Sequence, residues 1–458
     1  MSSNKNLIIV LSAGLLLTCF FLLADLDGIF KMLLLILFFI FTVTALKPKL
    51  GLLLLIIVRP CLDILTAEPI IETENFSLNF ASLFAILIIL FSAIILIKNL
   101  SNIENLPLKY NWLIFIAIAL ASIFFSYNSF SSLAEGLRLL SILAIYCLAY
   151  FLLNSEQDLK NLIKAIIASA IIPSLFALWQ FYTQTGLTVP LEGIYNRIYG
   201  TFAHPNLFAY YLLLPLALSL YLFLSGNKKQ INNILYFLFA IFLVIILGLT
   251  FTRGAWLSFL IIMAIVGVFR YRPLLVGAIV FAALAYFLVE PINYRVNDLI
   301  ANRSDTSIEW RLNLWNDAKE YVKEKPWLGY GAGVASDLIL DKRGEQFGSS
   351  DPHNDYLKIA SENGLIGLLA YLSLIVSLFI NLIKKYSAVG RTQFKTLILL
   401  AIGLAISFYV MSAADNIIRN TALQWSFWAL MGAIFAIDIS VIASDRRERS
   451  NLTDSAHR

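Results

Sequence analysis

The chain has few of the residues on which metal centres and disulfide frameworks depend. Its 458 residues include only three histidines and three cysteines. The cysteines (Cys19, Cys61 and Cys147) are odd in number and lie in apolar surroundings, so neither a disulfide framework nor a cysteine metal site is indicated. The acidic residues do not follow a metal-ligand pattern either, and we expect neither a bound metal nor a cofactor.

Charged residues are also scarce, and this scarcity decides the class of protein. They make up 14% of the chain, against about 25% in soluble domains, while hydrophobic residues make up 60%. Apolar runs of 17 or more residues recur, long enough to cross a hydrocarbon layer about 30 Å thick as helices. The composition predicts an all-α, polytopic transmembrane bundle of about 12–14 spans. The net charge of +5 lies mostly in short loops and does not indicate nucleic-acid binding.

The alternation of apolar runs and polar breaks predicts fourteen candidate spans. They are 7–24, 30–46, 50–66, 80–97, 111–126, 135–153, 161–181, 205–224, 231–249, 254–270, 273–290, 364–382, 395–412 and 421–442. The first is too long for a signal-peptide core and lacks a small-residue cleavage site, so we interpret it as a spanning helix. The span 50–66 is interrupted by Arg59, Pro60 and Asp63, which favours a re-entrant or broken segment.

The placement of lysine and arginine in the short loops predicts the orientation of the bundle. Alternate loops are rich in these residues, and the basic tail "DRRERS" belongs to the same set. By the positive-inside rule these loops are cytoplasmic, which places both termini in the cytoplasm. Only Lys31 and Arg419 run against the pattern. Four segments follow: N-terminal spans in 1–290, an extracytoplasmic loop at 291–363, C-terminal spans in 364–442 and a cytoplasmic tail at 443–458.

The long loop contains a predicted amphipathic helix. Apolar residues recur with helical spacing at Ile308, Leu312, Trp315 and Ala318, and Pro326 ends the pattern. The following "GYGAG" is typical of a flexible turn. We therefore expect a surface helix lying on the bundle, in a position compatible with a lid over a site.

Two arginines and two histidines, far apart in sequence, fall on the same predicted face. Arg197 and His204 precede one span, Arg253 begins another, and His353 precedes a third in "DPHNDYLKIASENGLIG". Taken singly, each is more often an interfacial anchor or a structural residue. Together they suit a phosphorylated, lipid-linked substrate, because arginine binds phosphate with two prongs and a neutral imidazole accepts a proton near neutral pH. We expect residues 353–363 to lie across the bundle and bring His353 to the two arginines.

At these residues the sequence resembles the O-antigen ligase and polymerase family of bacterial membrane glycosyltransferases. "HNDYLKIASENGLIG" fits the family pattern H-[NSQ]-x9-G-x-x-G, with His353, Asn354, Gly364 and Gly367 in place. "FTRGAWLSF" resembles its S-R-G-A-W turn, with Thr252 where serine is common. The resemblance is strong over 197–380, whereas the first 180 residues match only in hydrophobic character.

The resemblance implies a metal-independent transfer from an undecaprenyl-pyrophosphate-linked glycan to an acceptor hydroxyl, such as that of lipid A core, outside the cytoplasm. Arg197 and Arg253 would bind the pyrophosphate and His353 would activate the acceptor. Asn354, Arg311 and His204 would support them. A bacterial inner-membrane location is implied, with the bilayer, the donor and a glycolipid or glycan acceptor as partners.

Several alternatives remain open at this stage. A repeat-unit polysaccharide polymerase and a protein O-oligosaccharyltransferase share the same motif. An inorganic-carbon transporter would need ionisable groups inside the bilayer, and the candidates are Arg59 with Asp63 and Glu135 with Arg138. We favour a transferase over a transporter, and a ligase over a polymerase because the external loop is of moderate size.

Overall fold

The computed structural model describes ten stretches of the chain. They are residues 28–63, 69–73, 76–187, 196–226, 230–290, 292–293, 296–297, 306–344, 350–390 and 392–438. The candidate span 7–24, most of the predicted loop up to residue 305, and the tail 443–458 lie outside the described residues.

The described part of the chain is dominated by helices, as the composition predicts. The N-terminal elements are α2 (Gly28–Leu46), α3 (Pro48–Cys61), β1 (Pro69–Thr73), β2 (Phe76–Asn79), α5 (Phe80–Lys98), η1 (Leu100–Asn105), α6 (Lys109–Ala121), η2 (Ser122–Phe125), α7 (Ser129–Leu152), α8 (Glu156–Ser169) and α9 (Ile171–Thr183). The C-terminal elements are α10 (Pro205–Ser225), α11 (Ile231–Leu249), α12 (Arg253–Phe269), α13 (Arg272–Leu288), α15 (Thr306–Glu324), α16 (Ala335–Arg343), α17 (Asp355–Ala388), α18 (Gln393–Met411) and α19 (Thr421–Ala436). The strands β1 and β2 form one antiparallel hairpin.

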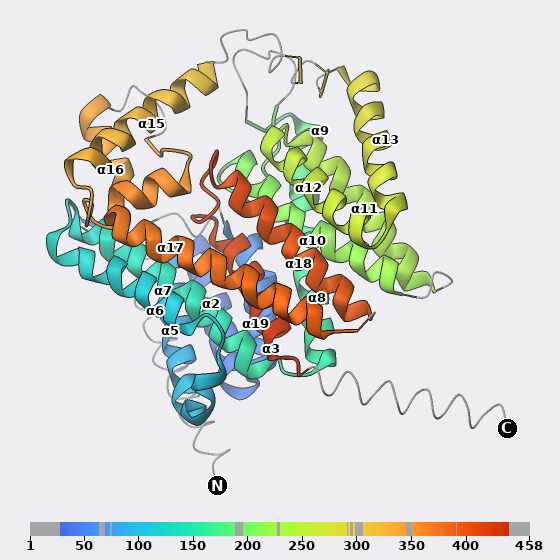
Figure 1. The fold of residues 1–458 in the computed structure, drawn as a ribbon, viewed down its shortest axis with the longest axis horizontal. Helices are drawn as coiled ribbons and strands as arrows, with labels where there is room; N and C mark the ends of the chain where they lie inside the picture. The colour runs from blue at the N-terminus through green and yellow to red at the C-terminus, as the bar shows by residue number, and fades with distance from the viewer. Residues whose placement is uncertain are drawn as a thin grey trace.

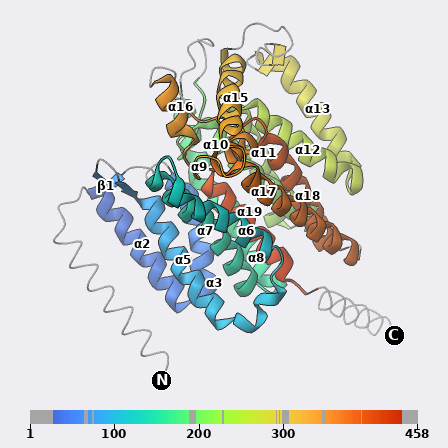
Figure 2. The same cartoon turned by 60° about the vertical axis from the view of Figure 1, so that its left-hand side comes forward.

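The helices form two packed groups. In one, α7 packs against α5, α6 and α19, and α3 packs against α2 and α8. In the other, α12 packs against α13 and α18, and α10 packs against α11. Contacts of α10 with α8 and α19, and of α17 with α6 and α18, join the groups. Figure 1 shows α17 running across the bundle, with α15 and α16 over one of its ends, and Figures 1 and 2 both show α13 at the periphery.

The helices confirm the fold class of a polytopic helical membrane protein. Within the described residues, seven helical segments are long and apolar enough to span a bilayer, and five further apolar helices are shorter. Every candidate span within the described residues overlaps a helix. The helix α3 has only 14 residues, fewer than the about 20 that a full crossing needs, which agrees with a broken segment at 50–66.

The ionisable residues that a transporter would use are paired with each other. Arg59 Nη1 bonds Asp63 Oδ1 at 2.7 Å, and Arg59 Nη2 donates to Thr421 Oγ1 at 2.6 Å. Arg138 pairs with Glu135 on the same face of α7. Arg138 also donates to Ile418 O, so each pair has an arginine that contacts the start of α19 or the loop before it, which indicates a structural role.

A break within α17 positions the segment that contains His353. Gly364 adopts φ 64° and ψ −172°, so residues 355–363 and the remainder of α17 are two helices joined by a kink. A Cβ at Gly364 would lie 2.1 Å from the carbonyl oxygen of Trp327, which only glycine permits. The N–H of Leu365, released by the kink, donates to Pro326 O at 2.7 Å. The segment that follows α15, residues 325–331, therefore docks directly on the break.

The glycine turn after α15 is tightly packed, which corrects the expectation of a flexible turn. Tyr330 N donates to Ser361 O at 3.0 Å and Gly331 N donates to Glu362 O at 2.7 Å. Gly329 and Gly331 have positive φ, and an added Cβ on either would collide with neighbouring atoms. These glycines allow close contact between backbone segments. The local sequence does not distinguish this role from flexibility.

The helix α15 ends at Glu324, before Pro326, as predicted, but its buried face differs from the predicted one. Leu312 is 49% exposed, whereas Leu314 and Asp317 are buried. Asp317 is accommodated because Lys342 bonds it at 3.0 Å and Arg343 also pairs with it, both from α16. An amphipathic pattern assigns an acidic residue such as Asp317 to the solvent-facing side of the helix, so the predicted buried face does not include it.

Candidate active site

His353 lies in a strained turn immediately before α17. Its φ is 50°, in the left-handed region that few non-glycine residues adopt. The next residue, Asn354, caps α17 by accepting from Tyr356 N and Leu357 N at 3.1 and 3.0 Å, and donates to Ala413 O at 2.9 Å. The turn therefore holds the imidazole against the loop between α18 and α19, residues 412–420, which we call the 412–420 loop. Strain of this kind is concentrated at functional sites.

The imidazole of His353 is oriented by a carboxylate of that loop. Its Nδ1 lies 3.1 Å from Asp415 Oδ1. Burial acts to raise the pKa of Asp415, but the hydrogen bond and charge of His353 and the charge of Arg311 outweigh it, so the pKa lies below its ordinary value. An ionised carboxylate only accepts hydrogen bonds, so Nδ1 carries the proton and Nε2 is the ring nitrogen able to take one. This is the tautomer a general base requires.

Asp415 is in turn connected to Arg197 through a buried amide. Asn206, in the first turn of α10, donates from Nδ2 to Asp415 Oδ2 at 2.8 Å. Its Oδ1 accepts from Arg197 Nη2 at 2.8 Å. The side chains of Asp415 and Asn206 thus join His353 to Arg197, which lies 156 residues earlier in the sequence.

The second arginine, Arg253, lies at the end of the turn that fixes the first. Arg197 donates from Nε to Thr250 O at 2.9 Å and from Nη2 to Thr252 Oγ1 at 3.0 Å. Thr252 is the N-cap residue of α12, and Arg253 is its first residue. Arg197 is therefore held against the turn that leads into α12, and Arg253 follows that turn at a helix N-terminus, where anions are favoured.

The residue after Arg253 is a glycine because α12 packs closely against a tyrosine at this position. A Cβ at Gly254 would lie 2.2 Å from Tyr210 Oη of α10. The contact brings the N-terminus of α12 against α10, beside Asn206. This gives a steric reason for the glycine of the "TRGAW" turn.

His204 and Arg311 complete the polar surroundings. The Nδ1 of His204 caps α10 by accepting from Asn206 N at 3.1 Å. Burial, and then the positive charges of Arg197, His353 and Arg311, lower the pKa of His204 to about 4, although Asp415 opposes them. His204 is therefore neutral at physiological pH and serves as a cap. Arg311 Nε of α15 is buried without a hydrogen-bond partner in the described part of the chain.

Aromatic side chains of α15 cover His353. The ring centroids of Trp310 and His353 are 5.4 Å apart, and Trp315 Nε1 donates to Pro352 O at 2.8 Å. The predicted surface helix thus forms one wall of the site.

A partly buried charge cluster supports the same turn. Arg419 of the 412–420 loop pairs with Asp351, and Lys358 Nζ lies 3.4 Å from Asp351 Oδ1 and 3.8 Å from Glu362 Oε1. Burial acts to raise the pKa of Asp351, but Lys358, Arg419 and His353 hold it below its ordinary value. Arg419, an exception to the positive-inside pattern, is therefore explained by its carboxylate partner.

An apolar cavity begins beside the arginine turn. Its volume is about 520 Å³, and it lies among α11, α12 and α13. Phe251, one residue before the cap of α12, and Trp256, one turn into that helix, line it. The polar turn thus adjoins a space with the chemistry of a lipid chain.

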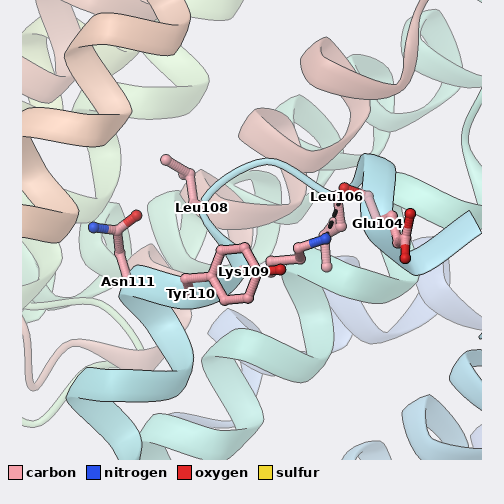
Figure 3. Close-up of a pocket in the computed structure, with 6 residues that line it drawn as sticks. All are labelled: Glu104, Leu106, Leu108, Lys109, Tyr110 and Asn111. Atoms are coloured by element: carbon pink, nitrogen blue, oxygen red, sulfur yellow. Dashed lines mark hydrogen bonds between the residues drawn. The ribbon is translucent and has the colours of Figure 1, made fainter.

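A second hollow lies at the opposite end of α6 from the glycine turn after α15. It has a volume of about 470 Å³. Figure 3 shows residues that line it, among them Glu104 and Lys109. Lys109 Nζ is engaged by the carbonyl oxygens of Ile103 and Glu104 at 3.2 and 2.7 Å. This hollow has no connection with His353 and is not part of the candidate site.

The structure brings together the residues that the sequence singled out and adds two that it missed. His353 and Arg197 share one hydrogen-bond chain, Arg253 is adjacent to it, and Asn354, His204 and Arg311 surround it. Asp415 and Asn206 were not anticipated, because "SAADN" was interpreted only as a loop poor in lysine and arginine. Among the described residues, no group of three or more histidine, cysteine or acidic side chains could hold a metal ion.

Comparisons with known proteins match much of the chain to proteins of one kind. The family described as O-antigen ligase matches residues 237–372. The O-antigen ligase of Salmonella typhimurium is 25% identical over 305 residues, covering 57% of this chain and 74% of the relative. The ComP-specific O-oligosaccharyltransferase of Acinetobacter baylyi is 27% identical over 314 residues, covering 62% of this chain and 54% of the relative. An uncharacterised protein of Haemophilus influenzae is 25% identical and covers 63% of this chain and 75% of its own length. The apolar helices and these relatives support a multi-pass protein of a bacterial inner membrane.

Proposed function

Because the chain belongs to the O-antigen ligase family, we propose that it transfers a glycan from an undecaprenyl-pyrophosphate donor to an acceptor hydroxyl. The observation that carries this proposal is the hydrogen-bond chain from His353 through Asp415 and Asn206 to Arg197. It joins a candidate base to a candidate phosphate-binding group in one partly buried site.

The donor half of the site consists of Arg197, Arg253 and the apolar cavity. Two arginines at this turn, one held against it and one that follows it, fit the oxygens of a pyrophosphate, and their fixed charge stabilises the negative charge that grows on the leaving group. The cavity among α11, α12 and α13 suits the prenyl chain. The donor would therefore bind with its headgroup at the arginine turn and its tail between helices.

The acceptor half is His353 with Asp415. As the acceptor oxygen forms its bond to the anomeric carbon, its proton passes to His353 Nε2. The bond from that carbon to the pyrophosphate oxygen breaks, and undecaprenyl pyrophosphate leaves with the electron pair. Asp415 holds the ring in the required tautomer and stabilises the imidazolium that forms, as in other carboxylate–histidine pairs.

The orientation in the membrane is proposed from the lysine and arginine pattern. Loops at the site end would be extracytoplasmic and both termini cytoplasmic. Ser131, at the site end of α7, and Asn227, which follows α10 by two residues in the sequence, offer cysteine positions that the charge pattern assigns to opposite sides. Labelling from outside with an impermeant thiol reagent should modify a cysteine at Ser131 and spare one at Asn227.

The acceptor is tested by deleting the gene and separating the cell's glycolipids and glycoproteins on gels. We expect loss of glycan-capped lipid and accumulation of the lipid-linked donor, both restored by the parent gene. Loss of a glycosylated protein instead would assign the oligosaccharyltransferase activity named for the Acinetobacter baylyi relatives. Single-repeat products would indicate a polymerase. Unchanged glycolipids and glycoproteins would contradict the proposed function.

A further inference from the structure

Asn206 occupies the single position between the two halves of the proposed site. Its side chain is buried, with the residue 8% exposed, and both ends of its amide are bonded. The Nδ2 end donates to Asp415 Oδ2 and the Oδ1 end accepts from Arg197 Nη2, each at 2.8 Å. Capping of α10 does not explain these bonds, because the cap is His204.

The chemistry of the two partners permits only one orientation of this amide. A carboxylate offers only acceptors and a guanidinium only donors, so Nδ2 must face Asp415 and Oδ1 must face Arg197. Without an amide between them, the opposite charges of Asp415 and Arg197 would attract each other directly. Such an ion pair would occupy the arginine that the phosphate needs and draw Asp415 away from His353.

We propose that Asn206 is a positioning residue that keeps Asp415 and Arg197 apart and couples donor binding at Arg197 to the basicity of His353. This inference rests on the proposed function. When a phosphate oxygen competes for the Arg197 guanidinium, the bond to Asn206 Oδ1 changes, and so does the polarisation of the Nδ2–H that Asp415 accepts. Asn206 itself gains and loses no proton.

Other charged groups also lie near His353, and the effect of Asn206 must be distinguished from theirs. Asp351 lies two residues before it, Arg311 approaches from α15, and His204 lies at the start of α10. None of these groups bonds both Asp415 and Arg197 in the described structure. A change at Asn206 therefore alters the link between the half-sites while leaving these three charges in place.

The test uses the full-length protein in nanodiscs with lipid-linked glycan as donor, and compares two variants with a matched control. Asn206→Leu removes both ends of the amide at similar volume, and Asn206→Asp removes only the donor to Asp415. Asn233→Leu is the control, because Asn233 is also buried and its side chain donates to Phe223 O, near the far end of α10.

The measurements are the donor KM and the pH dependence of kcat and of kcat/KM. The kcat/KM profile reports the free protein and the kcat profile reports the donor complex, so the separation of their acid limbs measures the coupling. We expect Asn206→Leu to raise the donor KM about 10- to 100-fold, as loss of a hydrogen bond to a charged group implies. It should also bring the two acid limbs together. Asn206→Asp should move both limbs to higher pH, because a second negative charge beside Asp415 favours the imidazolium.

The outcomes separate this inference from the function on which it rests. If both Asn206 variants turn over with the parent's donor KM and limb separation, the coupling is wrong and the proposed function stands. If they lower only the yield of folded protein, to the same extent as the control Asn233→Leu, then Asn206 is merely structural and the inference is again overturned. If the parent itself transfers no glycan to lipid, protein or a second glycan, the proposed function fails and takes this inference with it.

Discussion

Asp415 bonds Nδ1 of His353 at 3.1 Å, across 62 residues of sequence, and its other oxygen is bonded by Asn206. The pair links the turn before α17 to the loop after α18. Because Asp415 is acceptor-only when ionised, it selects the imidazole tautomer in which Nε2 can receive a proton.

We predict that Asp415→Asn lowers turnover by about 100-fold or more, since an amide no longer holds that tautomer. Turnover of purified protein with lipid-linked glycan measures this. Asp341→Asn is the matched control, because Asp341 is an aspartate of α16 that accepts a hydrogen bond from Tyr127 at an exposed position. Equal turnover in the two variants would remove Asp415 from the mechanism.

Arg253→Lys should raise the donor KM about tenfold or more, because a compact ammonium cannot make a two-pronged phosphate contact. Arg343→Lys alters an arginine of α16 that pairs with Asp317 of α15, and it should leave the donor KM at the parent value. If the lysine variant of Arg253 matches the parent, that residue is an interfacial anchor.

Gly254→Ala should destabilise the protein and reduce its activity, because the new Cβ would lie 2.2 Å from Tyr210 Oη. Tyr210→Phe removes that oxygen, so the double variant should recover much of the lost thermal stability. Unfolding midpoints in detergent for both single variants and the double variant measure the coupling. Additive losses would show that the contact does not explain this glycine.

Acid should destabilise the protein partly through His204. Its pKa falls from 6.5 to about 4 on folding, so the unfolded chain binds more protons within that window. Stability is therefore lost as the pH falls from about 6.5 to about 4. His204→Asn keeps an N-cap acceptor but does not titrate, so its unfolding midpoint should decline less between pH 7 and pH 5. Asp415, with a lowered pKa, contributes only below its ordinary value of 3.8, outside this window. An identical decline in the parent and the variant would contradict the assignment.

Hydropathy predicted most of the fold because a bilayer requires long apolar helices whatever their partners. The break at Gly364 was also close to expectation, since the span was predicted to begin there. The bounds of α3 and the buried face of α15 were less predictable. Asp317 shows why: its burial depends on Lys342 and Arg343, which belong to another helix.

The sequence motifs single out His353, Arg197 and Arg253 as candidate site residues, but they do not reveal the residues that connect them. Asp415 and Asn206 act through tertiary hydrogen bonds, and neither "SAADN" nor "HPNLF" carries a local signal for them. A partial signal was available, because Asp415 lies on the same predicted face as His353. Arg419 was noted only as an exception to the charge pattern, and its pairing with Asp351 accounts for it.

The most direct measurement of the central claim is glycan transfer by His353→Asn, with donor binding measured on the same preparation. Asparagine tolerates the left-handed backbone that His353 adopts, so the variant tests the imidazole rather than the turn. His457→Asn is the control, at a histidine outside the described residues. The account predicts a loss of transfer of about 100-fold or more with donor-lipid affinity close to the parent's, because the base acts on the acceptor. Normal transfer by His353→Asn would contradict it.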